Sequence, residues 1–236
     1  MCNHIIRNLA VSILAKKYDL FVKYSYYVDI NNKLGIELFI GNNKYDKNIH
    51  LGNNEFMKYY YNNIKNNTNF ICKRTFYQTE PITTILHNHL TNNKENIIDK
   101  NPYNERYKNN NDIFLHIRLT DAKIWNVGID FYTQCINSLI YDNIYIGSDD
   151  FNDELIKKLK TLYPSIIFID KNPIETIQFG STCKNIILSH GSFSAVIGYL
   201  GFYSNVYFLN KNSKWSKLDL FINKGFIPIN LNDTIK

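Results

Sequence analysis

The stretch "DIFLHIRLTDAKIW", residues 112–125, decides how the fold of this chain is interpreted. It begins with a continuous apolar run, residues 113–115, which is typical of a short buried strand. The run then alternates, so that His116 and Arg118 share one face of the strand close to its carboxyl end. Asp121 follows directly after this end. A core strand that ends in these charged side chains indicates either a ligand site or an ion pair.

The sequence that follows alternates between expected strands and expected helices. After the first strand, continuous apolar runs predict strands at residues 143–148, 165–170, 185–189 and 205–209. Amphipathic or capped runs predict helices at residues 130–140, with Asp130 as the N-cap, and at residues 149–163, 173–183 and 192–202. This alternation is typical of an α/β fold with a parallel sheet that is covered on both faces. Ligands of such sheets lie at the carboxyl ends of the strands.

The N-terminal half is less regular. It predicts helices at residues 3–20, 53–64 and 83–93 and extended segments at residues 19–27 and 69–78. The Asn-rich stretch 101–111 is polar and precedes the strand series directly, so we expect a boundary there. The resulting organisation is an N-terminal lobe, residues 1–110, and a C-terminal lobe, residues 111–236, with a cleft between them.

Composition narrows the class of protein. With 44% hydrophobic and 15% aromatic residues, the chain can build a packed core, which excludes a disordered protein. The net charge of +6 comes from scattered residues without an Arg-rich arm. We therefore expect no nucleic-acid partner, because a pocket for a phosphorylated small molecule explains a mild basic excess equally well.

The cysteines and the N-terminal segment indicate the cellular compartment of the protein. None of the four cysteines has a partner at C-x-x-C spacing, which predicts reduced thiols in an intracellular protein; they are Cys2, Cys72, Cys135 and Cys183. The apolar segment near the N-terminus is interrupted by charge and too short for a membrane span, and it lacks a signal-peptide pattern. We expect a soluble, cytoplasmic protein.

Two further strand ends carry polar motifs. "YIGSDD", residues 145–150, ends a strand in two carboxylates, which either read a nucleotide base or cap the next helix. "LSHGSFSAVIGYLG", residues 188–201, ends a strand in a Ser/Gly turn and opens a helix, the arrangement in which N–H groups hold a phosphate. The alternative is an ordinary capped turn, because the stretch has neither G-x-G-x-x-G nor a P-loop lysine.

Together, the three strand ends predict a pocket for a nucleoside diphosphate. The Arg118 guanidinium can bind two phosphate oxygens through parallel hydrogen bonds. Asp121 can hold Arg118 in place or take part in proton transfer. The alternative is that Arg118 and Asp121 form a buried pair that closes the interface between the lobes, and spacing alone does not separate the two interpretations.

These motifs resemble those of a known family. "HIRLTD" resembles the H-x-R-x-x-D motif of the α-1,2-fucosyltransferases (glycosyltransferase family 11), which α-1,6- and protein O-fucosyltransferases share more loosely. "IGSDD" is similar to the family's F-S-D-D segment, and "LSHGSFSAVIGYLG" resembles its N-S-T-F-S-W-W-x-A-x-L segment. "CNHIIRNLAVSILAKKY" resembles the opening stretch G-N-Q-x-x-x-x-A-x-x-x-x-A-x-K. The resemblance covers most of the C-terminal lobe and a short N-terminal patch, and residues 30–110 have no counterpart.

The resemblance implies a GT-B-like fold of two Rossmann-like lobes. It implies inverting transfer of fucose from GDP-fucose to a glycan hydroxyl in α-1,2 linkage, with neither a metal nor another cofactor. Arg118 would neutralise the diphosphate leaving group, and Asp121 is the candidate base for the acceptor hydroxyl. The donor would contact the remaining candidate residues, which are Asn3, His116, Asp149 or Asp150, Ser192, Phe193 and Ser194.

The sequence also departs from the family pattern. His4 stands where the family has the Gln of its opening motif, and the third motif lacks the family's Asn and Trp pair. Two alternatives therefore stay open. One is a glycosyltransferase of the same fold with another nucleotide sugar, and the other is a non-catalytic module that binds a nucleotide or a sugar.

Overall fold

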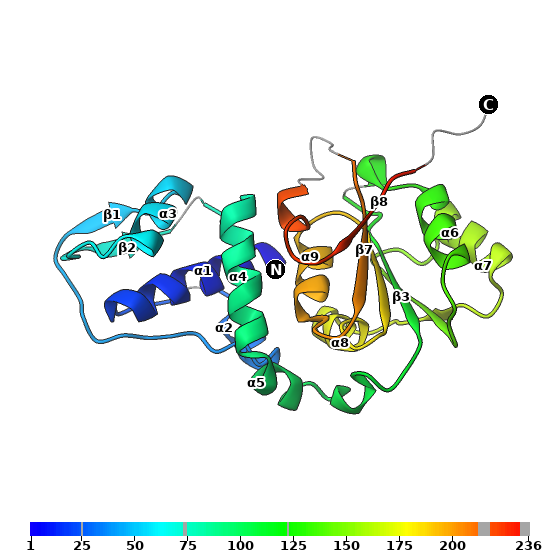
Figure 1. The fold of residues 1–236 in the computed structure, drawn as a ribbon, viewed down its shortest axis with the longest axis horizontal. Helices are drawn as coiled ribbons and strands as arrows, with labels where there is room; N and C mark the ends of the chain where they lie inside the picture. Colours follow the sequence, from blue (N-terminus) through cyan, green and yellow to red (C-terminus); the bar gives the residue numbers. More distant parts are fainter. Residues whose placement is uncertain (25, 73–74, 122, 212–217, 232–236) are drawn as a thin grey trace.

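The C-terminal half is built on one parallel sheet. The computed structural model describes residues 1–24, 26–72, 75–121, 123–211 and 218–231 (Figure 1). Six strands form the sheet in the order β5-β4-β3-β6-β7-β8, and every neighbouring pair is parallel. Their bounds are β3 Ile113–Ile117, β4 Ile144–Ser148, β5 Ile167–Phe168, β6 Asn185–Leu188, β7 Asn205–Leu209 and β8 Ile227–Ile229. The predicted α/β fold with a parallel sheet is confirmed.

The strand order reverses direction between β3 and β6. From β3 the chain adds β4 and β5 on one side, then returns to place β6, β7 and β8 on the other side. In open α/β sheets, ligands bind outside the carboxyl ends of the strands at such a switch point. The two motif-bearing strands, β3 and β6, are the neighbours that form it.

Helices cover both faces of the sheet (Figure 1). Helices α6 and α7 lie on one face and α8 and α9 on the other; their bounds are α6 Ile129–Asn137, α7 Glu154–Leu162, α8 Pro173–Gly180 and α9 Ser192–Leu200. Along β3, Ile113 and Leu115 belong to the apolar cluster under α6 and α7, whereas Phe114 belongs to the cluster under α8 and α9. This alternation directs His116, two residues after Phe114, toward α9.

The N-terminal half is mainly helical. Its elements are α1 Cys2–Tyr18, α2 Val28–Lys33, α3 Asn53–Tyr61, α4 Glu80–Asn92 and α5 Lys94–Asp99, with strands β1 Asn48–His50 and β2 Asn69–Ile71 paired in parallel. Short 3-10 helices occur at Asn104–Arg106, Lys123–Trp125 and Leu218–Leu220. One cluster of buried apolar side chains runs from α1 and α4 to α9 and β6, so the two halves share a core. The lobe boundary at residue 110 stays a prediction.

Several element ends differ from the sequence predictions. Residues 19–27 form no regular strand among the described residues; Leu20 makes a single bridge to Asn43, and Tyr27 has a left-handed φ of 58° at the start of α2. The N-cap of α6 is Gly128 and not Asp130, which lies in the first turn. Neither Asp149 nor Asp150 caps α7, because its cap is Asp153, whose carboxylate accepts from the Leu155 N–H.

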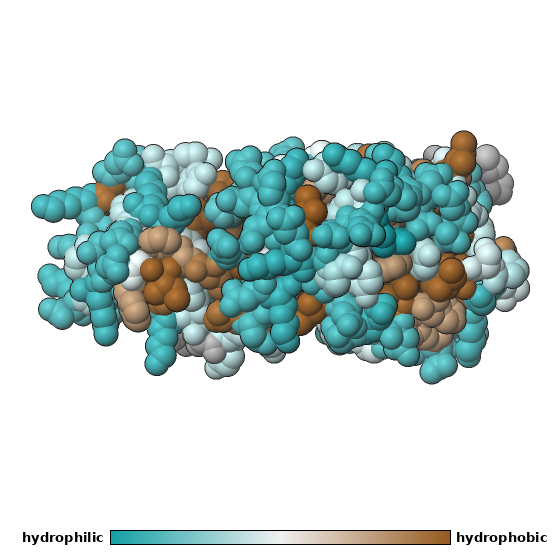
Figure 2. All heavy atoms as spheres, turned by 90° about the horizontal axis from the view of Figure 1, so that it is seen from below, coloured by the Kyte–Doolittle hydropathy of each residue, from teal (hydrophilic) through white to brown (hydrophobic). Residues whose placement is uncertain are grey.

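The surface carries its apolar side chains in separate patches. The face seen from below is mostly hydrophilic, and its hydrophobic residues form separate small patches (Figure 2). None of the described helices has the length and apolarity to cross a membrane. The four cysteine thiols are unpaired, and burial raises the pKa of Cys2, Cys135 and Cys183 to about 12.

Candidate functional site

A cavity of about 320 Å³ lies at the carboxyl edge of the sheet, at the switch point. It brings together four of the predicted residues, His116, Arg118, Asp149 and Phe193. The other lining residues are Met1, Ser148, Lys171, Pro173 and Thr176. The strand end that opened the sequence analysis therefore lies in a cavity and not in a closed interface.

His116 is a buried, neutral imidazole. Its Nδ1 lies 2.6 Å from the Ser194 hydroxyl on α9, and its ring stacks on Phe193 with 4.8 Å between centroids. Burial lowers the pKa of His116 to about 3, and the nearby Arg118 adds to this effect. A neutral imidazole has one donor and one acceptor nitrogen, and Nε2 bonds to no described residue. His116 can therefore offer Nε2 to a ligand without bringing a charge.

Arg118 and Asp121 form an ion pair, but not a buried one. The Asp121 carboxylate accepts from Arg118 Nε at 3.0 Å and from Nη2 at 2.7 and 2.8 Å. The Asp121 side chain is 64% exposed and lies outside the cavity lining, so the predicted pair exists at the surface. Its position at one edge of the guanidinium leaves Nη1 without a hydrogen bond to any described residue. Asp121 thus orients Arg118; its role as a base stays a prediction.

The free edge of Arg118 faces the start of α9. Gly191, the N-cap of this helix, has a φ of 91°, and a Cβ at this position would lie 3.6 Å from Arg118 Nη1. The first intrahelical bond runs from the Ala195 N–H to the Gly191 carbonyl. The N–H groups of Ser192, Phe193 and Ser194 therefore have no intrahelical acceptor. A helix N-terminus next to an arginine is a site for an anion such as a phosphate.

His190, which the sequence analysis did not single out, lies in the turn between β6 and α9 and is not part of the cavity lining. It is 2% exposed, and its Nε2 has no hydrogen-bond partner among the described residues. Burial lowers the pKa of His190, and the positive charge of Arg118 lowers it further. The only signal in the sequence was its place in the Ser/Gly turn after β6, between Ser189 and Gly191. A ligand acceptor or donor at Nε2 would remove the cost of an unsatisfied buried nitrogen.

The two carboxylates after β4 have different environments. Asp149 accepts from the Leu119 N–H at 2.7 Å and from the Thr120 hydroxyl at 2.6 Å, so it ties the end of β4 to the loop after β3. Burial acts to raise the pKa of Asp149, but the hydrogen bonds from Thr120 and Leu119 outweigh it, and the pKa lies below its usual value. Asp150 accepts from the Asn152 N–H through one oxygen, and it does not line the cavity.

The last predicted residue, Asn3, lies outside the cavity lining. Its side-chain oxygen accepts from Gln78 Nε2 at 2.8 Å, and Met1 is the residue of the N-terminal half that lines the cavity. Lys171 is one of the five lining residues that were not predicted, and a hydrogen bond to Tyr103 raises its pKa. The cavity therefore has two cations, Lys171 and Arg118.

Metal-ligand clusters are absent from the part of the chain that the structure describes, since no three His, Cys, Asp or Glu side chains gather there. In class, the molecule is an α/β protein with a cavity at the switch point of a six-stranded parallel sheet. No protein-family model matches the chain, and no curated protein is similar to it in sequence.

Solved structures of fucosyltransferases show a distant likeness. The fucosyltransferase NodZ from Bradyrhizobium matches with a TM-score of 0.39 and 12% identity, over 65% of this chain and 58% of that chain. NodZ α-1,6-fucosyltransferase co-crystallised with GDP matches with a TM-score of 0.37 and 13% identity, over 62% and 55% of the two chains. The present chain thus spans less than two thirds of the length of either. Matches this distant carry no argument about activity, which must come from the chain's own residues.

Proposed function

We propose that the chain is a glycosyltransferase that moves fucose from GDP-fucose to a glycan hydroxyl, with inversion and without a metal ion. The motif resemblance favours an α-1,2 linkage. The observation that carries the proposal is the position of Arg118, whose free Nη1 faces the unpaired N–H groups at the start of α9. In the proposed organisation, residues 111–236 hold the donor and residues 1–110 lie on the side of the acceptor.

The geometry supports stabilisation of a diphosphate leaving group. When the bond between the sugar and the diphosphate breaks, negative charge grows on the phosphate oxygens and the sugar becomes oxocarbenium-like. Arg118 and the N–H groups of Ser192 and Phe193 would stabilise this charge more in the transition state than in the ground state. Asp121 holds the guanidinium in place, so little reorganisation is needed.

Neutral polar groups would complete the donor site. His116 would contact the donor through Nε2, while the hydrogen bond between its Nδ1 and the Ser194 hydroxyl would hold the ring in place. His190 would contact it through its unpaired Nε2. Because both imidazoles have lowered pKa values, neither would act as a cation near neutral pH, and the positive charge at the phosphates would come from Arg118 and Lys171.

A specific observation favours a second candidate, a glycosyltransferase with another nucleotide sugar. Guanine is held by a carboxylate that accepts from two base N–H groups at once. Both oxygens of Asp149 already accept hydrogen bonds from residues 119 and 120. Asp150 keeps one oxygen free of described partners, so it is the better placed of the two predicted carboxylates, although it lies outside the cavity lining.

Calorimetric titration with GDP and UDP, each with and without EDTA, tests the nucleotide. We expect GDP to bind more tightly than UDP and EDTA to have no effect. Equal affinities would favour the second candidate, and loss of binding in EDTA would contradict the proposal of a metal-independent site. Release of GDP from GDP-fucose then separates an enzyme from a non-catalytic binding module, because a module would bind the donor and leave it intact.

A further inference from the structure

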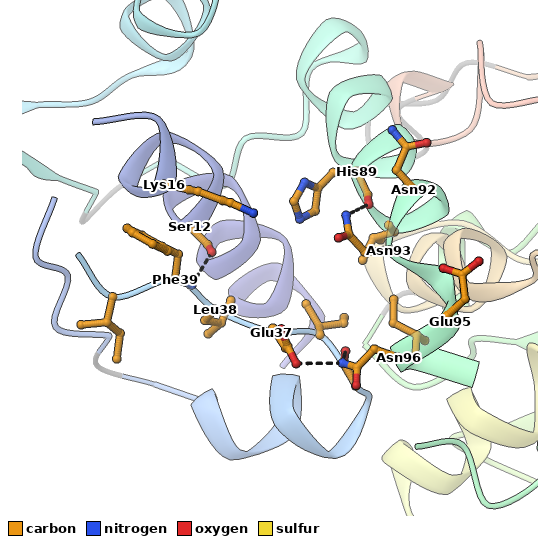
Figure 3. Close-up of a pocket in the computed structure, with 15 residues that line it drawn as sticks. Ser12, Lys16, Glu37, Leu38, Phe39, His89, Asn92, Asn93, Glu95 and Asn96 are labelled. Carbon is orange, nitrogen blue, oxygen red and sulfur yellow. Dashed lines mark hydrogen bonds between the residues drawn. The ribbon is translucent and has the colours of Figure 1, made fainter. Parts of the chain in front are cut away.

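A second cavity, of about 480 Å³, lies between α1, residues 35–40 and the junction of α4 with α5 (Figure 3). It is separate from the cavity of about 320 Å³ at the switch point, which is the proposed donor cavity. Met1, which precedes α1, lines the donor cavity, whereas Ser12 and Lys16 of α1 line this one. With a rise of about 1.5 Å per residue, the two cavities are roughly 16–22 Å apart along the helix.

One wall of this second cavity is apolar. It consists of Ile36, Leu38, Phe39 and Ile40, a segment of the chain that only Glu37 interrupts. The Phe39 N–H donates to the Ser12 hydroxyl at 2.8 Å, which fixes this wall against α1. Ile40 is 60% exposed, so the wall presents hydrocarbon to the solvent side of the cavity. An apolar wall that is held in place can receive a flat apolar face of a ligand.

The opposite wall is polar and has free hydrogen-bonding capacity. Asn96 Nδ2 donates to the Gly35 carbonyl at 2.8 Å and to Glu37 Oε1 at 3.2 Å, and Asn93 Nδ2 donates to the His89 carbonyl at 2.7 Å (Figure 3). These bonds fix both amides and leave their side-chain oxygens without described partners. The His89 ring also makes no hydrogen bond to a described residue. The wall therefore offers both donors and acceptors in fixed positions.

The charges of the lining disfavour an anionic ligand. Lys16 is the one cationic side chain among the lining residues, and Glu37 and Glu95 are acidic. Burial lowers the pKa of His89, and the charge of Lys16 lowers it further, so the imidazole is neutral near pH 7. A phosphate or a sulfate would meet more negative than positive charge in this cavity. A neutral ligand with many hydroxyl groups fits the lining better.

We propose that the second cavity binds neutral sugar units of an oligosaccharide. A sugar ring has a C–H face, which would pack on Phe39 and its neighbours, and a rim of hydroxyl groups, which would bond to Glu37, His89 and Asn96. Each of these groups can exchange hydrogen bonds with a hydroxyl, since carboxylate and amide oxygens accept and a neutral imidazole does both. The site needs no nucleotide, so it stands whether or not the donor cavity holds GDP.

The test uses an array of neutral, sialylated and sulfated oligosaccharides, followed by calorimetry with the best-retained glycan in the absence of nucleotide. The variants are Glu37→Ala, which removes the acceptor oxygens of an exposed residue, and His89→Phe, which keeps a ring and removes both nitrogens. We expect the wild type to retain neutral glycans and each variant to bind roughly tenfold more weakly. Glu105→Ala is the matched control, because Glu105 is exposed and lies outside this cavity.

Three outcomes would overturn the proposal. They are retention of no neutral glycan, a preference for sialylated or sulfated glycans, and an unchanged Kd in both cavity variants. Melting temperatures of all three variants show whether a loss of binding is a loss of folding. Because no nucleotide is present, a negative result here leaves the donor proposal untouched, and a failure of GDP to bind leaves this one untouched.

Discussion

Two arginine–aspartate pairs lie at opposite ends of β3, and they differ in what surrounds them. Arg106 and Asp112 pair at the amino end at 2.8 Å, and Arg118 and Asp121 pair at the carboxyl end at 2.7 Å. The arginine side chains are almost equally exposed, at 26% and 27%. The aspartate side chains are 5% and 64% exposed. The difference between the pairs therefore lies in the partner and its neighbours, not in the arginine.

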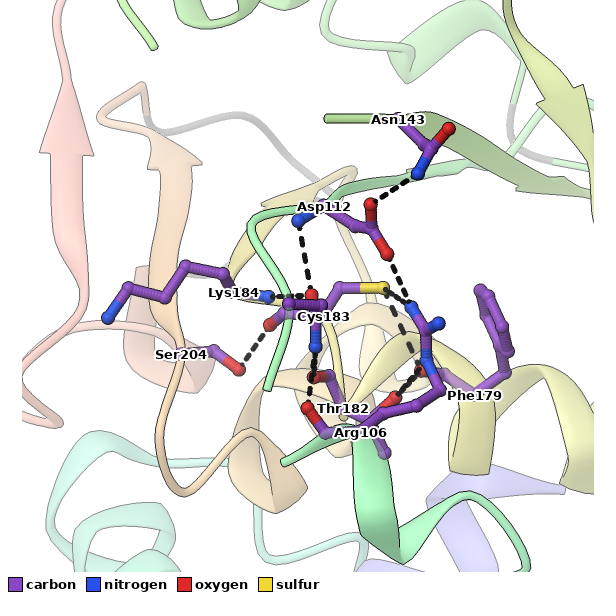
Figure 4. Close-up of polar contacts among 9 residues, drawn as sticks. Arg106, Asp112, Asn143, Phe179, Thr182, Cys183, Lys184 and Ser204 are labelled. Carbon is purple, nitrogen blue, oxygen red and sulfur yellow. Dashed lines mark hydrogen bonds and ion pairs between the residues drawn. The ribbon is translucent and has the colours of Figure 1, made fainter. Parts of the chain in front are cut away.

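The pair at the amino end contacts several other residues (Figure 4). Arg106 donates from Nε to the Thr182 hydroxyl at 3.2 Å, and its guanidinium lies 4.4 Å above the Phe179 ring. Asp112 accepts from Asn143 Nδ2 at 2.9 Å as well as from Arg106. These contacts join the starts of three strands, β3, β4 and β6. The cluster is a structural clamp, because Nε and Nη2 of Arg106 and both carboxylate oxygens of Asp112 have partners within the protein.

The pair at the carboxyl end is connected on one side only. Asp121 occupies one edge of Arg118, and Nη1 faces the start of α9. His190, which precedes Gly191 in the chain, has a buried Nε2 without a described partner. Unsatisfied polar groups cost free energy unless a ligand pairs with them. The buried, many-partnered Asp112 favours a role of the first pair in the fold, whereas the exposed second pair beside a cavity is the one for which we propose a ligand.

The largest expected effect is the loss of activity in Arg118→Lys. An ammonium is a point charge and cannot place two parallel donors on phosphate oxygens as a guanidinium does. Release of GDP from GDP-fucose should fall by about 10²–10³ in kcat, because removing one preorganised group from a transition-state site costs about this much. The melting temperature should change little. Activity within about threefold of the wild type would mean that this pair, too, is structural.

Asp112→Ala should have the reverse effect. It leaves Arg106 unpaired in a half-buried position and removes the acceptor of Asn143, so we expect a loss of about 3 kcal/mol in the free energy of unfolding. GDP affinity per folded molecule should stay unchanged, because the clamp lies at the edge of the sheet remote from the donor cavity. Urea unfolding and GDP calorimetry on the same sample measure both. A stability within about 0.5 kcal/mol of the wild type would contradict the clamp.

A smaller effect is expected for His190→Phe. The substitution removes an unsatisfied buried nitrogen and keeps an aromatic ring, so stability should be nearly unchanged. GDP should bind roughly tenfold more weakly, because one ligand hydrogen bond is lost. His87→Phe is the matched control, since His87 is half-buried against Tyr199 and Phe226 and lies outside the donor cavity. Equal GDP affinity in both variants would show that His190 does not contact the nucleotide.

The sequence predicted the features that depend on local patterns. The bounds of β3 and β7 agree with continuous apolar runs, and His116 and Arg118 lie in the cavity because alternation and strand polarity direct them there. The edge strand β8 was missed, because it is three residues long and contains Pro228, which cannot donate in the middle of a sheet.

The features that were missed depend on partners far along the chain. The carboxylate of Asp149 is held by Thr120, and this loop contact has no periodic signal in the sequence. His190 was passed over because its burial and its unpaired nitrogen follow from packing and not from sequence spacing. The second cavity, likewise, forms only where α1 meets residues 35–40 and the α4–α5 junction, which no local pattern brings together.

The smallest expected effect is the contribution of Asp149 to stability. It bears on the comparison because Asp149 lines the cavity at the carboxyl ends of the strands and also holds the loop after β3. The hydrogen bonds from Thr120 and Leu119 hold the pKa of Asp149 below its unfolded value, so ionised Asp149 stabilises the fold above about pH 4. This stabilisation is lost as the pH falls through the lower, folded pKa. Because Asp149 is exposed, solvent screening should limit the contribution to less than about 1 kcal/mol.

Asp149→Asn should therefore lower the free energy of unfolding at pH 6, and this loss should be smaller at pH 3, because the stabilisation by the ionised carboxylate declines as the pH falls below the unfolded pKa. Urea unfolding of both proteins at the two pH values measures the difference. Asp142→Asn is the control, because Asp142 is exposed and its side chain bonds to no described residue. A difference between wild type and Asp149→Asn that is as large at pH 3 as at pH 6 would show that the ionised carboxylate does not hold the loop. Asp149 would then be available to hydrogen-bond a nucleotide base, and it would have no structural role at the carboxyl ends of the strands.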